Sequence, residues 1–89
     1  MIIGILGSGQ LGRMLAIAAA QLGIKTHIFA PDASTSPAGD IAFAATEAAY
    51  DDHDALVRFA NSVDVITSEF ENVPATTLDI LAIHKNVSP

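Results

Sequence analysis

The sequence predicts an α/β fold, a parallel sheet of four or five strands flanked by helices. Residues 2–6 form a near-continuous apolar run bounded by glycine, which is typical of a strand buried on both faces. A helical pattern follows at once over residues 10–22. Further short apolar runs then alternate with helical patterns, as in βαβ units with right-handed crossovers.

The first helix is defined by its apolar spacing and by its end. Gly23 follows the last apolar position and predicts the C-terminal stop. We expect Met14 of this helix to be an ordinary core residue. The apolar positions at helical spacing are Leu11, Met14, Leu15, Ala18, Ala19 and Leu22.

Residues 25–30 predict the second strand because β-forming residues dominate the segment, with Phe29 expected in the core. Residues 31–40 hold two prolines, a glycine and three Ser or Thr residues, and they predict a loop. Residues 41–45 predict a short third strand, and residues 63–67 a fourth.

Two more helices and the start of a fifth strand complete the prediction. Asp51 and Asp52 offer N-caps for a helix that runs to about residue 60. Pro74 suits the first position of a helix that runs to about His84, and Val87 begins the fifth strand. The side chains expected to face inward are Leu56, Phe59, Ala60, Leu78, Leu81 and Ala82.

Composition excludes several functional classes. The 89 residues allow one small domain, and the formal charge of −6 with scattered Lys and Arg argues against a nucleic-acid surface. There is no cysteine for a disulfide or a common zinc site. No signal peptide or membrane span is apparent, so we expect a cytoplasmic protein without membrane contact. Because so short a chain supplies about three helices, we expect one flank or edge of the sheet to lie against something absent from it.

The glycine loop from Gly7 to Gly12 is the first candidate binding segment. A strand that passes through glycines into a helix brings backbone N–H groups and the positive helix end together, which suits a phosphate. A purely structural role, a tight turn and close packing, remains an alternative. Asp32 lies where a ribose-binding acid of a nicotinamide site would stand, although Pro31 is expected to turn its carboxylate away.

The second candidate segment, Glu69 to Asn72, follows the fourth predicted strand. It should therefore lie at the carboxyl edge of the sheet, where open α/β sheets bind ligands. In an extended segment Glu69 and Glu71 would share one face. A solvated acidic turn with Asn72 as a helix cap is the alternative. No metal site is predicted, and His27, His53 and His84 are isolated and expected to be structural.

Two strings together carry a specific resemblance: Gly-Ile-Leu-Gly-Ser-Gly-Gln-Leu-Gly-Arg-Met-Leu at 4–15 and Ser-Glu-Phe-Glu-Asn-Val-Pro at 68–74. They resemble the ATP-dependent N5-carboxyaminoimidazole ribonucleotide synthetases of purine biosynthesis, also called the ATPase subunit of phosphoribosylaminoimidazole carboxylase. The similarity runs over the whole chain. It implies a Rossmann-like pre-ATP-grasp N-terminal domain over residues 1–89.

The resemblance also implies a function and its residues. In that family Mg-ATP activates bicarbonate as carboxyphosphate, and the carboxyl group passes to the amine of aminoimidazole ribonucleotide. The N-terminal domain lines the ribonucleotide site. By comparison with a related transformylase, Gly9, Gln10, Leu11 and Glu69 are expected to bind substrate, and a homodimer is expected.

The ATP-grasp and C-terminal domains of the family are absent from these 89 residues, so no catalytic residue is assigned and the chain alone is expected to be inactive. Two alternatives stay open at the level of sequence. One is an NAD(P)- or FAD-binding module of an oxidoreductase. The other is an α/β interaction domain whose glycine loop binds no ligand.

Overall fold

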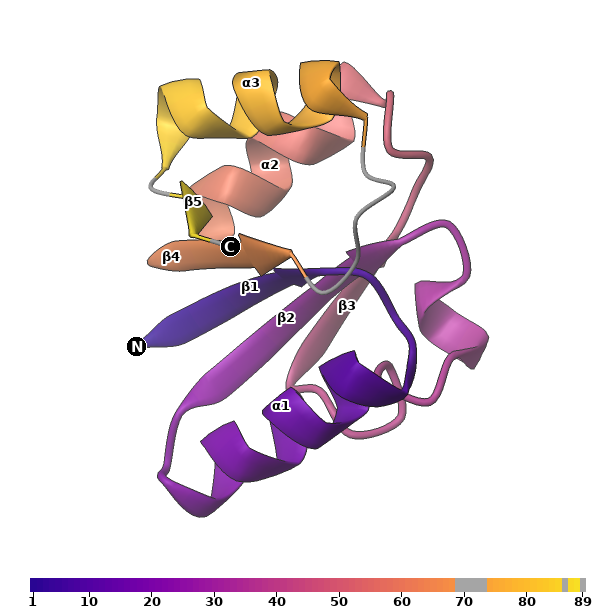
Figure 1. The fold of residues 1–89 in the computed structure, drawn as a ribbon, viewed down its shortest axis with the longest axis vertical. Helices are drawn as coiled ribbons and strands as arrows, with labels where there is room; N and C mark the ends of the chain where they lie inside the picture. The colour runs from indigo at the N-terminus through magenta and orange to yellow at the C-terminus, as the bar shows by residue number, and fades with distance from the viewer. Residues whose placement is uncertain (69–73, 86, 89) are drawn as a thin grey trace.

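The sheet is parallel throughout, and its first strand lies at the centre. A computed structural model describes residues 1–68, 74–85 and 87–88. Within them, the strand order is β3-β2-β1-β4-β5, so β1 lies between β2 and β4 as the α/β prediction requires (Figure 1). The bounds are Ile2–Leu6 (β1), Lys25–Ala30 (β2), Ala44–Glu47 (β3), Val65–Ser68 (β4) and Val87–Ser88 (β5).

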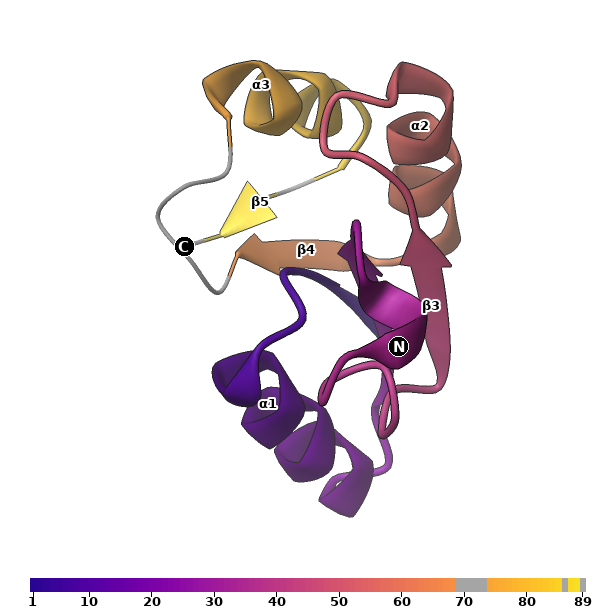
Figure 2. The same cartoon turned by 90° about the vertical axis from the view of Figure 1, so that its right-hand side faces the viewer.

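The helices cover the two faces of the sheet unequally. Helix α1 (Gln10–Gln21) lies on one face, whereas α2 (His53–Ser62) and α3 (Ala75–His84) pack side by side on the other (Figure 2). A short 3₁₀ helix, η1 (Ala33–Thr35), lies in the connection between β2 and β3. No helix in the described ranges has both the length and the apolar character that a membrane crossing needs.

The larger core cluster lies between the sheet and the α2–α3 layer. The rings of Phe29 and Phe59 meet at a centroid distance of 5.2 Å, and both side chains are buried. Gly4 of β1 allows the Phe59 ring to pack against its backbone, because a Cβ at this position would lie only 2.7 Å from Phe59 Cζ. The prediction that Leu56, Phe59 and Ala60 of α2 face inward is confirmed, as is the prediction that Phe29 lies in the core. Other buried members of the cluster include Leu6, Ile66 and Leu81.

Helix α1 packs differently from the prediction. Its buried residues are small, namely Gly12, Ala16 and Ala19. The larger apolar residues of the helix, Leu11, Met14 and Leu15, are exposed instead. Met14 is 64% exposed, so its prediction as a core residue was wrong.

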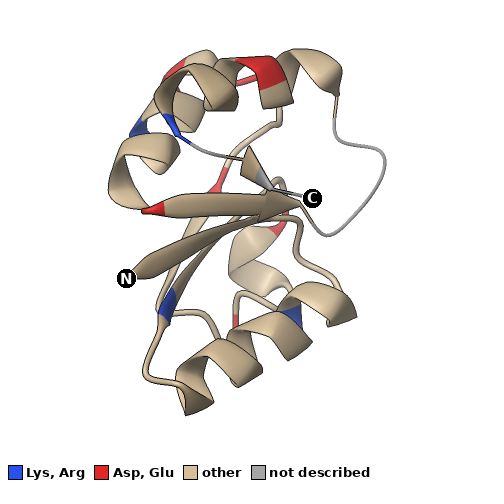
Figure 3. Ribbon diagram, turned by 60° about the vertical axis from the view of Figure 1, so that its left-hand side comes forward, with Lys and Arg blue, Asp and Glu red and all other residues tan. Residues whose placement is uncertain are grey.

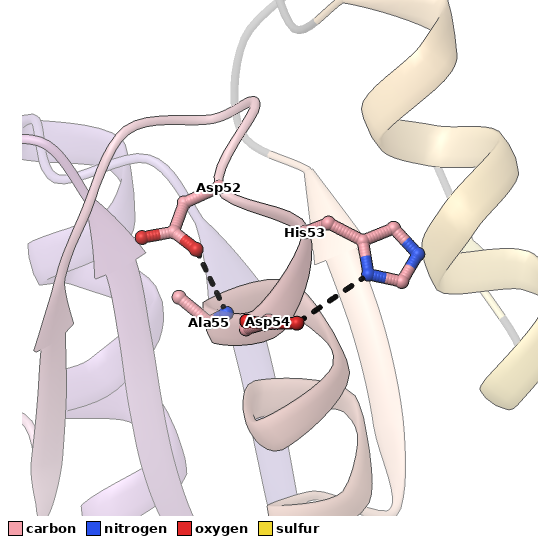
Figure 4. Close-up of polar contacts among 4 residues, drawn as sticks. All are labelled: Asp52, His53, Asp54 and Ala55. Atoms are coloured by element: carbon pink, nitrogen blue, oxygen red, sulfur yellow. Dashed lines mark hydrogen bonds and ion pairs between the residues drawn. The ribbon is translucent and has the colours of Figure 1, made fainter.

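Helix α2 begins where the sequence indicates. The Asp52 side chain accepts a hydrogen bond from the Ala55 backbone N–H, with 3.1 Å between Oδ1 and N (Figure 4). This bond satisfies one of the N–H groups that the first helical turn leaves without a carbonyl partner. Asp52 is therefore the N-cap, one of the two residues predicted for that role.

Other boundaries and one helix face also differ from the sequence prediction, and β4 begins at Val65 rather than at residue 63. Strand β3 begins at Ala44 rather than at Ile41, because the backbone around Ile41 still turns, its N–H donating to the Ala38 carbonyl. In α3, Ala82 is exposed and was wrongly placed inward. Thr77 and Leu81, one helical turn apart, are the residues that α3 buries.

Candidate functional site

The glycine loop leaves the centre of the sheet at its carboxyl edge. Strand β1 ends at Leu6, and Gly7 follows with φ of 116°, a backbone conformation that strongly favours glycine. The Gly7 N–H donates to the Phe29 carbonyl of β2, with 3.0 Å between N and O. Gly7 therefore turns the chain away from the sheet while it remains bonded to the neighbouring strand.

The first turn of α1 has the properties of an anion-binding end. The first helical bond runs from the Arg13 N–H to the Gly9 carbonyl, at 3.0 Å between N and O. The N–H groups of Gln10, Leu11 and Gly12 therefore have no carbonyl acceptor within the helix. Gly9, at the N-cap position, has no side chain to cover them, and no acidic residue lies in the first turn. Together with the helix dipole, these N–H groups favour an anion.

Three of the four predicted substrate-binding residues lie at this end. Gly9, Gln10 and Leu11 are all exposed, and the Leu11 side chain is 53% accessible. Gln10 is the first residue of the helix. Their exposure leaves room for a ligand to approach the N–H groups, as a backbone-binding site requires.

Strand β4, which precedes the second candidate segment in the sequence, ends beside the start of the glycine loop. Strand β4 pairs with β1 in a register that sets Ser68 opposite Leu6. At the other end of the pair, the Ile2 N–H donates to Asp64 Oδ2 at 2.7 Å, and the Asp64 N–H donates to the Ile2 carbonyl at 2.8 Å. The chain therefore leaves β4 next to Gly7, because paired strands lie about 4.8 Å apart.

The predicted residues Glu69 to Asn72 lie outside the described residues. The structure accordingly does not test the role of Glu69, which stays a prediction. It does describe both flanks of the segment, from Ser68 of β4 and from Pro74, which stands at the N-cap position of α3.

Asp32 is bound by the glycine loop itself. The Ser8 hydroxyl donates to Asp32 Oδ1, with 2.6 Å between the two oxygens. The sequence pattern suggested Asp32 as a ribose acceptor and did not indicate Ser8 as its partner. A signal was present, since Ser8 carries a hydroxyl group directly between Gly7 and Gly9, which have no side chains.

The histidines do not converge on the glycine loop. His27 joins three elements: Nε2 lies 2.6 Å from Thr46 Oγ1 of β3, and Nδ1 lies 3.1 Å from Ser62 Oγ of α2. Burial lowers the pKa of His27 below its ordinary value. His53 lies on the surface, with Nδ1 3.9 Å from Asp54 Oδ1 (Figure 4). In the part of the chain that the structure describes, no three His, Asp or Glu side chains form a group that could hold a metal.

Charged residues are scattered over the ribbon rather than gathered at one surface (Figure 3). Helix α1 carries a single charged residue, Arg13. A ligand at the carboxyl edge would therefore be held mainly by backbone N–H groups and neutral side chains from the described residues.

A family model described as the ribonucleotide synthetase preATP-grasp domain matches residues 1–89. The chain belongs to this family. The preATP-grasp assignment agrees with the parallel α/β sheet and its central first strand, and it confirms the resemblance inferred from the two sequence strings.

Individual proteins that are similar to the chain are ribonucleotide synthetases as well. The chain is 55% identical over 80 residues to N5-carboxyaminoimidazole ribonucleotide synthase of Brucella melitensis, covering 90% of this chain and 22% of the relative. The synthetase structure from Thermus thermophilus matches with a TM-score of 0.90 and 39% identity, covering 98% of this chain and 24% of that one.

A third match is to a ligand complex. It is an Aspergillus clavatus N5-carboxyaminoimidazole synthase with ADP and 5-aminoimidazole ribonucleotide, at a TM-score of 0.81 and 31% identity. The match covers 99% of this chain and 23% of that chain. This preATP-grasp chain thus spans about a quarter or less of the proteins it matches.

Proposed function

We propose that this preATP-grasp chain is the N-terminal, ribonucleotide-binding part of an enzyme of de novo purine biosynthesis. The enzyme carboxylates 5-aminoimidazole ribonucleotide to N5-carboxyaminoimidazole ribonucleotide, using ATP and bicarbonate. The observation that carries the proposal is the β1–β4 register, with Leu6 opposite Ser68. It sets the start of the glycine loop beside the end of β4, the strand that Glu69 follows in the sequence, in a family whose relatives are named for this reaction.

Each proposed substrate-binding residue has a physical role. The N–H groups at Gln10 and Leu11 are suited to negatively charged or carbonyl-like oxygens of the ribonucleotide. The Gln10 amide can both donate and accept a hydrogen bond. Gly9 lets the ligand approach the backbone closely, and Glu69 is proposed to accept hydrogen bonds from a ribose hydroxyl or from the substrate amine.

ATP use is proposed for the complete enzyme and not for these 89 residues. Solved relatives are described as complexes with ADP or ATP, and each is several times longer than this chain. We therefore assign Mg-ATP and bicarbonate to ATP-grasp and C-terminal domains outside residues 1–89. No catalytic residue is assigned within the chain, and the purified 89-residue chain should not hydrolyse ATP.

The NAD(P)- or FAD-binding alternative is not favoured. The matches are to carboxyaminoimidazole ribonucleotide enzymes. The acid that a dinucleotide site would use for ribose, Asp32, already accepts a hydrogen bond from Ser8.

A homodimer in the cytoplasm is the proposed setting. Helix α1 and its C-cap residue expose several large apolar side chains, which are suited to burial against a second copy. They are Leu11, Met14, Leu15, Ile17 and Leu22.

The proposal is tested by Glu69→Ala in the complete protein that carries this domain. The variant loses a hydrogen bond to a charged group, so kcat/KM for aminoimidazole ribonucleotide should fall. The fall should correspond to a loss of about 1.5–3 kcal/mol in transition-state stabilisation. The ATP dependence should stay nearly unchanged. Steady-state kinetics with each substrate varied in turn would measure both.

Asp79→Ala is the matched control, since it removes an exposed acid from α3. It should leave both kinetic constants as they are. Equal losses for ribonucleotide and ATP in Glu69→Ala would point to damaged folding, and no loss at all would remove Glu69 from the proposed site.

A further inference from the structure

The loop between β2 and β3 buries three of its residues and is closed by hydrogen bonds of its own. We refer to residues 31–43 as the β2–β3 loop; within it Ala33, Ser36 and Ala38 are buried. The Ser36 hydroxyl donates to the Ala33 carbonyl at 2.9 Å and accepts from the Gly39 N–H at 3.0 Å. A Cβ at Gly39 would lie only 1.8 Å from the Ala33 carbonyl oxygen. The loop therefore folds back on itself closely enough to require glycine there.

This loop is fixed to the rest of the molecule at two places. At β3, Glu47 Oε1 accepts from the Ser34 hydroxyl at 2.6 Å and from the Ser34 N–H at 3.2 Å. At the glycine loop, the Ser8 hydroxyl donates to Asp32 Oδ1 at 2.6 Å, and the Ser8 carbonyl accepts from the Ala38 N–H at 3.3 Å. The second attachment reaches the segment that leads into α1.

Ser8 is consequently held by its side chain and by its backbone. It lies between Gly7 and Gly9, and glycine gives a chain more conformational freedom than any other residue. Two hydrogen bonds to a packed loop restrict that freedom. They fix the direction in which the chain enters α1, and with it the aim of the first N–H groups of the helix.

We propose that Ser8 and Asp32 are positioning residues for the ribonucleotide site, fastening the glycine loop to the β2–β3 loop so that the N–H groups of Gln10 and Leu11 are preset for the substrate. The inference about substrate rests on the proposed function. The fastening itself rests on the hydrogen bonds alone.

Kinetics of the complete protein test the effect on substrate. Ser8→Ala and Asp32→Ala should each lower kcat/KM for aminoimidazole ribonucleotide about tenfold, the scale of one lost hydrogen bond to a charged group. The KM for ATP should not change. Ser8→Thr keeps the hydroxyl and should restore most of the loss. Ser34→Ala is the matched control, because it removes the hydroxyl bond from the same loop to Glu47 and leaves Ser8 bonded.

Amide hydrogen exchange of the same variants, without ligand, tests the fastening. Exchange at Arg13, whose N–H makes the first helical bond to the Gly9 carbonyl, should accelerate about tenfold in Ser8→Ala and Asp32→Ala, and remain as in the wild type in Ser8→Thr and Ser34→Ala. Ile28 of β2, buried in the sheet, reports whether the fold is intact. If exchange at Ile28 also accelerates in Ser8→Ala, the fold of that variant is disturbed. Asp32→Asn, which weakens the Ser8–Asp32 bond without removing the acceptor, then replaces it in the test.

The outcomes separate the two claims. A wild-type protein without ribonucleotide-dependent turnover would refute the proposed function, while the exchange data would still decide the fastening. An active wild type whose Ser8→Ala and Asp32→Ala variants keep normal kcat/KM would overturn the positioning role. Unchanged exchange at Arg13 would overturn the fastening.

Discussion

At the scale of residues, hydroxyl groups join segments that are far apart in the sequence. Ser8 bonds to Asp32, Ser62 lies against His27, and the Thr77 hydroxyl donates to the Tyr50 carbonyl. A sequence pattern marks such residues only as polar positions in a turn or a helix. Their partners depend on the tertiary fold, which is why the sequence analysis identified the glycine loop and missed the bond that holds it.

His27 makes the stability of the domain depend on pH. Ser62 Oγ donates to the Phe59 carbonyl at 2.7 Å, so His27 Nδ1–H donates to Ser62, and Nε2 accepts from Thr46. This pairing uses the neutral imidazole, in agreement with a pKa that burial lowers. The unfolded state therefore binds a proton more readily than the folded state.

The expected result follows from that difference. Stability should be fully present above the unfolded pKa of about 6.5 and should fall as pH drops from there through the folded pKa. Urea unfolding at about pH 8 and about pH 5.5 would measure the loss. The loss of stability at the lower pH should be smaller in His27→Gln. It should be as large as in the wild type in His53→Gln, because His53 lies on the surface. An identical pH dependence in wild type and His27→Gln would contradict the account.

At the scale of elements, the helix ends were more predictable from sequence than the helix faces. Asp52 was recognised as a cap because capping depends on residues close in sequence. The buried face of α1 was not recognised, because large and small apolar residues alternate around it. Which of them faces the sheet depends on how closely the helix packs. Gly12, Ala16 and Ala19 form the contact that allows the closest approach.

The start of β3 was misplaced for a similar reason. Ile41 and Phe43 are apolar, but Phe43 is exposed, with the Lys25 Nζ 4.5 Å from its ring centroid. Strand β3 is instead determined by its pairing with β2, where His27 lies opposite Ala44. Register between strands is a tertiary property that local hydrophobicity does not encode.

The cap of α2 gives a stability prediction at this scale. Asp52→Ala should lower the free energy of unfolding by about 1 kcal/mol, because the Ala55 N–H loses its acceptor. Asp52→Asn retains a side-chain oxygen and should cost much less. Chemical denaturation would measure both, with Asp51→Ala as the control for removing a neighbouring charge. If Asp51→Ala lost more stability than Asp52→Ala, the assignment of Asp52 as the cap would be wrong.

At the scale of the whole molecule, the sheet is better covered on one face than on the other. Two helices cover one face and α1 alone covers the other (Figure 2). Several large apolar residues of α1 are exposed. The expectation of an incompletely covered flank came from chain length and from the needs of a parallel sheet. The residues that form the exposed apolar surface could be named only from the structure.

The exposed side of α1 predicts self-association of the 89-residue chain at micromolar concentration. Met14→Gln combined with Leu22→Gln should shift the sedimentation coefficient toward the monomer, since both side chains are mostly exposed in one copy. Ile83→Gln is the matched control, because Ile83 is 79% exposed but lies on α3. A wild-type chain that sediments strictly as a monomer would end the prediction, and an equal shift in Ile83→Gln would assign the contact elsewhere.

The central claim is that the carboxyl edge formed by β1 and β4 binds the aminoimidazole ribonucleotide. Titration of the isotope-labelled protein with this ribonucleotide, followed through its backbone amide resonances, tests it most directly. The account predicts saturable shifts centred on Gly9, Gln10 and Leu11 and on the residues that follow Ser68, and no shifts with NAD⁺. Shifts at those amides with NAD⁺, or ribonucleotide shifts centred away from this edge, would contradict it.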